Sequence, residues 1–165
     1  MKLALLLFCI YNYLMYYYQP INRLYFEPSI MIFDNVDKNI NRKKTVVAVD
    51  FDGTIAISNF PKIIAPIPYA FDVLKVLMND PYTTLILWTC REGELLQQAL
   101  DFCELYGIKF DYVNENDEER TKYYGNDSRK IGADLYIDDK SYQGSQGVEK
   151  LWRDWYFWMK NNGMI

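Results

Sequence analysis

Hydrophobic residues recur with two different periods along residues 45–159, and the two periods alternate. Short runs of apolar and β-branched residues predict buried strands at residues 45–49, 83–89, 108–113 and 133–137. Apolar residues spaced three or four positions apart predict helices at residues 69–78, 94–106 and 148–159. This alternation predicts an α/β fold, namely a three-layer α/β/α, Rossmann-like domain with a mainly parallel sheet.

Two segments of this domain carry no such period. Residues 53–68 contain one glycine and three prolines, which predicts a loop between the first strand and the first helix. Residues 114–130 are polar and aperiodic, and they predict a second long loop.

The first 44 residues differ from the rest of the chain. Residues 3–18 are apolar or aromatic except for Asn12, and they follow a single lysine, as at the start of a signal peptide. No small-residue cleavage motif follows, and the stretch is shorter than the ~20 residues that span a bilayer. A weak membrane anchor, a cleaved signal and a poorly ordered or spurious extension all stay open. We expect an extension and linker at residues 1–44 and one domain at residues 45–165.

The composition narrows the available chemistry. The 165 residues include no histidine, which excludes Ser-His and Cys-His catalysis and histidine-bound metals. The net charge of −4 argues against nucleic acid as the partner, because phosphate binding needs a basic face. The three cysteines (Cys9, Cys90 and Cys103) are widely spaced, which favours neither a disulfide framework nor a zinc site. A reducing, cytoplasmic location is therefore expected, with a membrane-anchored one as the alternative.

Two pairs of aspartates follow predicted strands. Asp50 and Asp52 come directly after the first strand, where Gly53 allows a tight turn, and Asp138 and Asp139 follow the last strand. Each pair alone is also typical of a turn. Ligands of parallel sheets bind at the carboxyl ends of the strands, so we expect four acids along one edge. Oxygen ligands of this kind suit Mg²⁺, which adds waters and a substrate phosphate to its carboxylates.

Three further polar residues are candidates for phosphate binding. Thr89 ends the second predicted strand and Arg91 follows two residues later, so a hydroxyl and a guanidinium are available to phosphate oxygens there. Lys130 precedes Asp138 by eight residues, although a single lysine is more often only a solvated surface residue.

These residues, in this order, resemble the motifs of the haloacid dehalogenase superfamily of phosphohydrolases. The stretches VAVDFDGTI, LILWTCREGELL and SRKIGADLYIDD look closest to its small capless phosphatases, and the resemblance covers residues 45–142. It implies a Mg²⁺-dependent phosphohydrolase that acts on a small phosphate monoester through an aspartyl-phosphate intermediate.

The resemblance also implies a role for each catalytic residue. Asp50 is expected to be the nucleophile, and Asp52 the acid that protonates the leaving oxygen and then the base that activates water. Thr89 is expected to bind the phosphoryl group, and Lys130 to offset the negative charge. Nearby carboxylates raise the pKa of Asp52 while the metal and Lys130 lower it, and the sequence does not decide which effect dominates.

The metal would be bound, on the same resemblance, by the Asp50 carboxylate, the Asp52 main-chain carbonyl and Asp138, with Asp139 as a second acidic candidate. Family caps are inserted either just after the Asp50–Asp52 loop or between Thr89 and Lys130. The predicted elements already fill both intervals, and a further domain needs about 50 residues. We therefore expect no large cap domain.

Two rival functions stay open. One is a non-catalytic phosphate- or metal-binding module, tethered to a membrane by residues 3–18. The other keeps the catalysis but acts on the 3′-phosphate end of a polynucleotide, which the acidic charge of the chain makes less favourable.

Overall fold

A parallel sheet of four strands forms the centre of residues 44–165, the part of the chain that the computed structural model describes. The strands lie in the order β5-β4-β1-β6, and all neighbouring pairs are parallel. Their bounds are Thr45–Val49 for β1, Thr83–Leu87 for β4, Tyr112–Val113 for β5 and Leu135–Ile137 for β6. The parallel register brings the carboxyl ends of β1, β4 and β6 to the same edge.

Both faces of the two central strands are covered, which explains their continuous apolar sequences. Val47 and Val49 of β1 are fully buried. Val46 and Ala48 point to the other face, because side chains alternate along a strand, and they pack there with Ile86. The central strands are therefore rigid supports for the loops that follow them.

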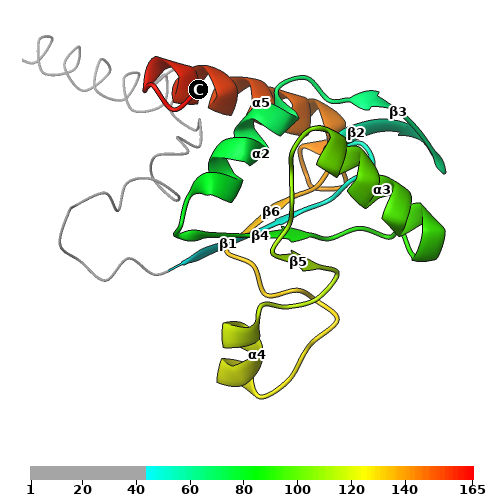
Figure 1. Cartoon of the computed structure of the whole chain (residues 1–165), viewed down its shortest axis with the longest axis vertical. Helices are drawn as coiled ribbons and strands as arrows, with labels where there is room; N and C mark the ends of the chain where they lie inside the picture. Colours follow the sequence, from blue (N-terminus) through cyan, green and yellow to red (C-terminus); the bar gives the residue numbers. More distant parts are fainter. Residues whose placement is uncertain (1–43) are drawn as a thin grey trace, which may run out of the picture. The chain divides into compact units, whose positions relative to one another are not determined.

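Three long helices cover one face of the sheet, and one short helix lies on the other side (Figure 1). The long helices are α2 (Ala70–Asn79), α3 (Gly93–Leu105) and α5 (Gly144–Asn161); the short one is α4 (Glu118–Tyr124). Phe71 of α2 packs edge-on against Phe102 of α3, with ring centroids 5.9 Å apart. Trp152 and Trp155 of α5 are buried, so the aromatic face of the last helix packs inside the domain.

A two-stranded antiparallel hairpin follows β1. Its strands are β2 (Ala56–Asn59) and β3 (Lys62–Pro66). The sequence predicts a loop here, and that prediction is wrong. Pro61 lies in the turn, and Pro66 ends a strand of a sheet with only two members, so neither proline removes a hydrogen bond from a central strand.

Two other boundaries differ from the prediction. The segment 114–130, predicted as a loop, contains α4, because the Asp117 side chain caps its first turn by accepting from the Arg120 N–H at 3.0 Å. The strand predicted at 108–113 is reduced to two residues. The Asp111 carboxylate accepts from the Leu85 N–H at 2.7 Å and so replaces a main-chain bond of the sheet.

The α/β fold class with a parallel sheet is confirmed, and residues 44–165 contain no cap domain. β1 begins at Thr45, as predicted. None of the helices in this described part has the length and apolar composition needed to cross a membrane. The interpretations of residues 3–18 concern residues outside the described part.

Candidate functional site

The polar residues that follow β1, β4 and β6 are aligned by main-chain hydrogen bonds. The N–H of Asp50 donates to the carbonyl of Ile137 at 2.9 Å, so Asp50 lies beside the residue that precedes Asp138. The N–H of Trp88 donates to the carbonyl of Val49 at 2.9 Å. Thr89 therefore follows β4 at nearly the level at which Asp50 follows β1.

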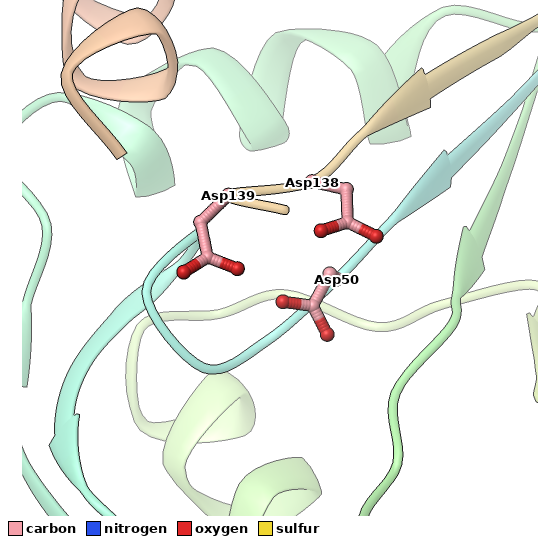
Figure 2. A group of neighbouring side chains, drawn as sticks. All are labelled: Asp50, Asp138 and Asp139. Atoms are coloured by element: carbon pink, nitrogen blue, oxygen red, sulfur yellow. The ribbon is translucent and has the colours of Figure 1, made fainter. Parts of the chain in front are cut away.

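Three of the four predicted acids converge. Asp50, Asp138 and Asp139 each contribute a carboxylate oxygen, and these oxygens all lie within 4.8 Å of one another. Figure 2 shows the three carboxylates side by side, with Asp50 at the end of β1 and the other two after β6. We call these three residues the acidic cluster.

Gly53 makes this close approach feasible. Its φ of +80° lies in the left-handed region, and a Cβ at this position would lie 2.6 Å from Oδ2 of Asp139. The loop after β1 thus packs directly against the carboxylate that follows β6. A Cβ here would therefore displace the Asp139 carboxylate from its position in the acidic cluster.

Thr54 connects the loop after β1 to the loop after β6 through hydrogen bonds. Its buried hydroxyl donates to Oδ2 of Asp50 at 3.2 Å and accepts from the N–H of Asp139 at 2.9 Å. The indole N–H of Trp152 donates to the Thr54 carbonyl at 2.7 Å, which ties α5 to the same point. The positions of the two loops therefore depend on the hydrogen bonds of the buried residue Thr54.

The acidic cluster carries more negative charge than its surroundings compensate. Burial, with a smaller contribution from the charges of Asp138 and Asp139, raises the pKa of Asp50 from 3.8 to about 7. Hydrogen bonds from the Phe51 main chain and from Thr54 act in the opposite direction but do not cancel this rise. At neutral pH, Asp50 is therefore poised between its protonated and ionised forms.

The hydrogen bonding of Asp139, like the raised pKa of Asp50, indicates that a cation would fit the acidic cluster. Its Oδ2 accepts from Nζ of Lys140 at 2.6 Å, whereas its Oδ1 is buried and lacks a hydrogen-bond partner within residues 44–165. A buried carboxylate oxygen without a partner is costly unless a cation or donor satisfies it. Three oxygen donors without histidine or cysteine match a hard divalent cation such as Mg²⁺. The acidic cluster is thus a candidate metal site.

The fourth predicted acid, Asp52, points to a different partner. Its carboxylate oxygens accept from Nε and Nη2 of Arg91, each at 2.8 Å, in a bidentate ion pair. The Arg91 side chain is fully buried, and the Asp52 side chain is 27% exposed. We call these two residues the arginine–aspartate pair.

The ion pair with Arg91 favours the ionised form of Asp52. Burial raises the pKa of the Asp52 carboxyl, but the hydrogen bonds and charge of Arg91, together with Ser58 and the charge of Lys140, outweigh burial, so that the pKa falls below 3.8. The sequence left the direction of this shift open. In the structure, Asp52 is an ionised carboxylate at neutral pH.

The other two predicted site residues, Thr89 and Lys130, make their contacts with residues outside the acidic cluster. The Thr89 N–H donates to the Asn114 side chain at 2.8 Å, and the Thr89 hydroxyl accepts from the Arg91 N–H at 3.3 Å. Lys130 is exposed, and its Nζ lies 5.7 Å from the centroid of the Tyr136 ring. Among the residues that the structure describes, the ion pair to the acidic cluster comes from Lys140 and not from Lys130.

Two residues of the site, Thr54 and Lys140, have no role that the sequence pattern predicts, although Lys140 is adjacent to a predicted site residue and Thr54 lies two residues after another. Thr54 closes the DFDGT motif, and Lys140 directly follows the Asp138-Asp139 pair. The hydrogen bond and charge of Asp139 raise the pKa of Lys140, so this lysine remains a cation beside the cluster.

The fold and the acidic cluster define an α/β protein with a parallel sheet and a candidate metal site at its carboxyl edge. No family model matches the chain, and no curated protein matches it. The solved structure of a conserved protein from Bacteroides thetaiotaomicron is 36% identical, with a TM-score of 0.55, and the match covers 68% of this chain and 92% of that chain. The chain belongs to the same family as this conserved protein.

Proposed function

We propose that the chain is a Mg²⁺-dependent phosphohydrolase of the small capless type in the haloacid dehalogenase superfamily. The observation that carries the proposal is the convergence of Asp50, Asp138 and Asp139 at the carboxyl edge of the sheet. The Asp52 carboxylate two residues further on supplies the acid–base group that a metal site alone does not need. Small phosphate monoesters are the proposed substrates, and the net charge of −4 disfavours nucleic acid.

The acidic cluster would hold the Mg²⁺ ion, together with the main-chain carbonyl of Asp52. The ion would supply positive charge that offsets the charge of a bound phosphate. Lys140, 2.6 Å from Asp139, and Lys130, on a flexible exposed side chain, are the lysines available to add to this compensation. The chain thereby lowers the repulsion between a carboxylate nucleophile and an anionic substrate.

In the first step, an Asp50 oxygen attacks phosphorus as the bond from phosphorus to the ester oxygen breaks. The product is an aspartyl-phosphate on Asp50 and a released alcohol, whose oxygen takes its proton from water. Thr89 is the proposed hydrogen-bond donor to the phosphoryl oxygens. Because Arg91 keeps Asp52 ionised, this step favours leaving groups that need little protonation.

In the second step, a water attacks the phosphorus of the aspartyl-phosphate, and Asp52 accepts a proton from that water. The bond from phosphorus to the Asp50 oxygen breaks, which releases inorganic phosphate and restores the Asp50 carboxylate. Asp52 then gives the accepted proton to the solvent, because its pKa is lowered, and the cycle is complete. An ionised Asp52 suits this step directly, since a base must be free of its proton.

Phosphate release from p-nitrophenyl phosphate tests the proposal. Turnover is expected with Mg²⁺, to be lost in EDTA and to return when Mg²⁺ is restored. Ca²⁺ should support it poorly, because its longer and looser coordination displaces the phosphate. Full activity in chelator would contradict the proposal.

A second candidate is a metal- or phosphate-binding module without catalysis. The arginine–aspartate pair favours it, because a carboxylate engaged by two hydrogen bonds at 2.8 Å is not free to donate a proton. Such a module would bind Mg²⁺ or inorganic phosphate in calorimetry but release no p-nitrophenol.

A further inference from the structure

Arg91 lies between β4 and α3, yet its guanidinium contacts two other segments of the chain. Besides the two bonds to Asp52, Nη2 donates to the main-chain oxygen of Pro61 at 3.0 Å. Its central carbon also lies 5.0 Å from the ring centroid of Phe51 and 5.3 Å from that of Phe60. One side chain thus joins the loop after β1 to the turn of the β2–β3 hairpin.

We propose that Arg91 is a positioning residue that clamps Asp52 and the turn of the β2–β3 hairpin into one unit beside the acidic cluster. The kinetic consequence of this clamp rests on the proposed phosphohydrolase function, whereas its effect on the hairpin does not. A lysine cannot fully replace Arg91, because only a guanidinium donates to both Asp52 carboxylate oxygens and to the Pro61 carbonyl.

Burial argues for positioning rather than for direct phosphate binding, which is the role that the sequence suggests for Arg91. The side chain is 0% exposed, and two of its three nitrogens are already bonded. The third nitrogen, Nη1, lacks a hydrogen-bond partner among the described residues, but it is buried as well. A phosphate in the site would reach Nη1 only if the hairpin moved. Asp52 and Phe60, by contrast, are partly exposed, at 27% for the Asp52 side chain and 61% for Phe60.

Hydrogen exchange of the full chain tests the clamp without any assay of activity. Arg91→Met keeps the length of the aliphatic stem but removes every hydrogen bond of the guanidinium. Amide exchange in residues 56–66 is expected to become at least about tenfold faster, since the hairpin turn loses its bond to a buried group. The matched control is Arg153→Met, which removes an exposed arginine of α5 and should leave this exchange unchanged.

Kinetics separate positioning from direct binding. With p-nitrophenyl phosphate and Mg²⁺, Arg91→Met is expected to lower kcat roughly 10- to 100-fold, because a small displacement of Asp52 costs about this much. KM and the inhibition constant of inorganic phosphate should stay within about twofold of wild type. Arg91→Lys should have an intermediate kcat, since it retains one charged donor toward Asp52.

The outcomes are distinct. Faster hairpin exchange, with a lower kcat and unchanged phosphate inhibition, supports the clamp. Unchanged exchange overturns it, and so does weaker phosphate inhibition at an unchanged kcat, which would make Arg91 a direct ligand. If the wild-type chain releases no p-nitrophenol, the proposed function fails and hairpin exchange alone decides the clamp. If Arg91→Met does not fold, as judged by thermal melting, Arg91→Lys carries the same comparisons.

Discussion

Asp50 and Asp52 lie two residues apart in one loop, yet their carboxylates have opposite surroundings. Asp50 belongs to the acidic cluster, where burial and two neighbouring acids raise its pKa to about 7. Asp52 belongs to the arginine–aspartate pair, where a buried guanidinium lowers its pKa below 3.8. The difference comes from the turn that follows Asp50, because it directs the Asp50 carboxylate toward the residues after β6 and the Asp52 carboxylate toward Arg91 and the β2–β3 hairpin.

The acidic cluster and the arginine–aspartate pair differ in how far their negative charge is compensated. In the acidic cluster, a buried Asp139 oxygen has no hydrogen-bond partner in the described part of the chain, and the pKa of Asp50 is about 7. The cluster therefore gains stability from a cation. The arginine–aspartate pair is already neutralised by two short hydrogen bonds. Ligand binding is therefore expected at the cluster, and control of geometry at the pair.

A substitution in the acidic cluster is expected to cause the largest loss of turnover. Asp50→Asn removes the proposed nucleophile, and turnover of p-nitrophenyl phosphate should fall by at least about 10³-fold, as for other enzymes that lose a nucleophile. Asp72→Asn, at an exposed aspartate of α2, is the matched control and should keep wild-type rates. Near-normal turnover in Asp50→Asn would show that another residue attacks the phosphate.

The next largest loss of turnover is expected when the aspartate of the arginine–aspartate pair is substituted. Asp52→Asn removes the proposed base, and steady-state turnover should fall about 10²- to 10⁴-fold. Because the first step needs little protonation when the leaving group is p-nitrophenol, rapid mixing should show a burst of about one equivalent before the slow phase. Equal losses for p-nitrophenyl and phenyl phosphate, without a burst, would mean that Asp52 acts in neither step.

The pH dependence of the free energy of unfolding, measured without metal, tests whether Asp50 and Asp52 have shifted pKa values. The Asp50 carboxyl holds its proton in the native state up to about pH 7, whereas the unfolded chain loses it near 3.8. The unfolded state therefore binds fewer protons between these values, and the free energy of unfolding falls as the pH rises through that window. With a shift of three pKa units, the fall is at most about 4 kcal/mol.

Urea unfolding in EDTA, followed by tryptophan fluorescence at pH 4 to 7, measures this fall. Asp50→Asn should abolish the share of the slope that Asp50 contributes. Asp52 has the opposite sign: its stabilising contribution is present above its unfolded pKa and is lost only as the pH falls below 3.8. A slope identical in wild type and Asp50→Asn would show that Asp50 ionises normally.

The sequence predicts the acidic cluster because strand periodicity and parallel topology suffice for it. Residues that directly follow β1 and β6 must lie together when those strands pair in parallel, as Val49 does with Ile137. Asp50 and Asp138 are therefore predictable without any knowledge of side-chain orientation. The helices of residues 69–106 and the closing helix are predictable for the same reason, since their apolar spacing is regular.

The arginine–aspartate pair is not predictable in this way. Arg91 lies 39 residues beyond Asp52, and its orientation depends on a hairpin that glycine and proline content marked as a loop. The neighbouring lysines show the same limit, because Lys130 and Lys140 flank the same strand and only loop geometry brings Lys140 to Asp139. Contacts made by loops depend on tertiary packing, which local sequence patterns do not encode.

The smallest expected effect tests how tightly the two loops of the acidic cluster fit together. Gly53→Ala places a Cβ 2.6 Å from Oδ2 of Asp139, at a φ of +80° that alanine rarely adopts. The free energy of unfolding should fall by about 1–3 kcal/mol, the usual cost of such strain. The Asp139 carboxylate must also shift from its position in the acidic cluster, so the rise in melting temperature on adding Mg²⁺ should shrink. Gly163→Ala is the control, since it shares a positive φ of +72° but has open space around it, and it should keep the full Mg²⁺ response. If Gly53→Ala lost stability while its Mg²⁺ response matched that of Gly163→Ala, the close approach of Gly53 to Asp139 would matter for folding and not for the metal site.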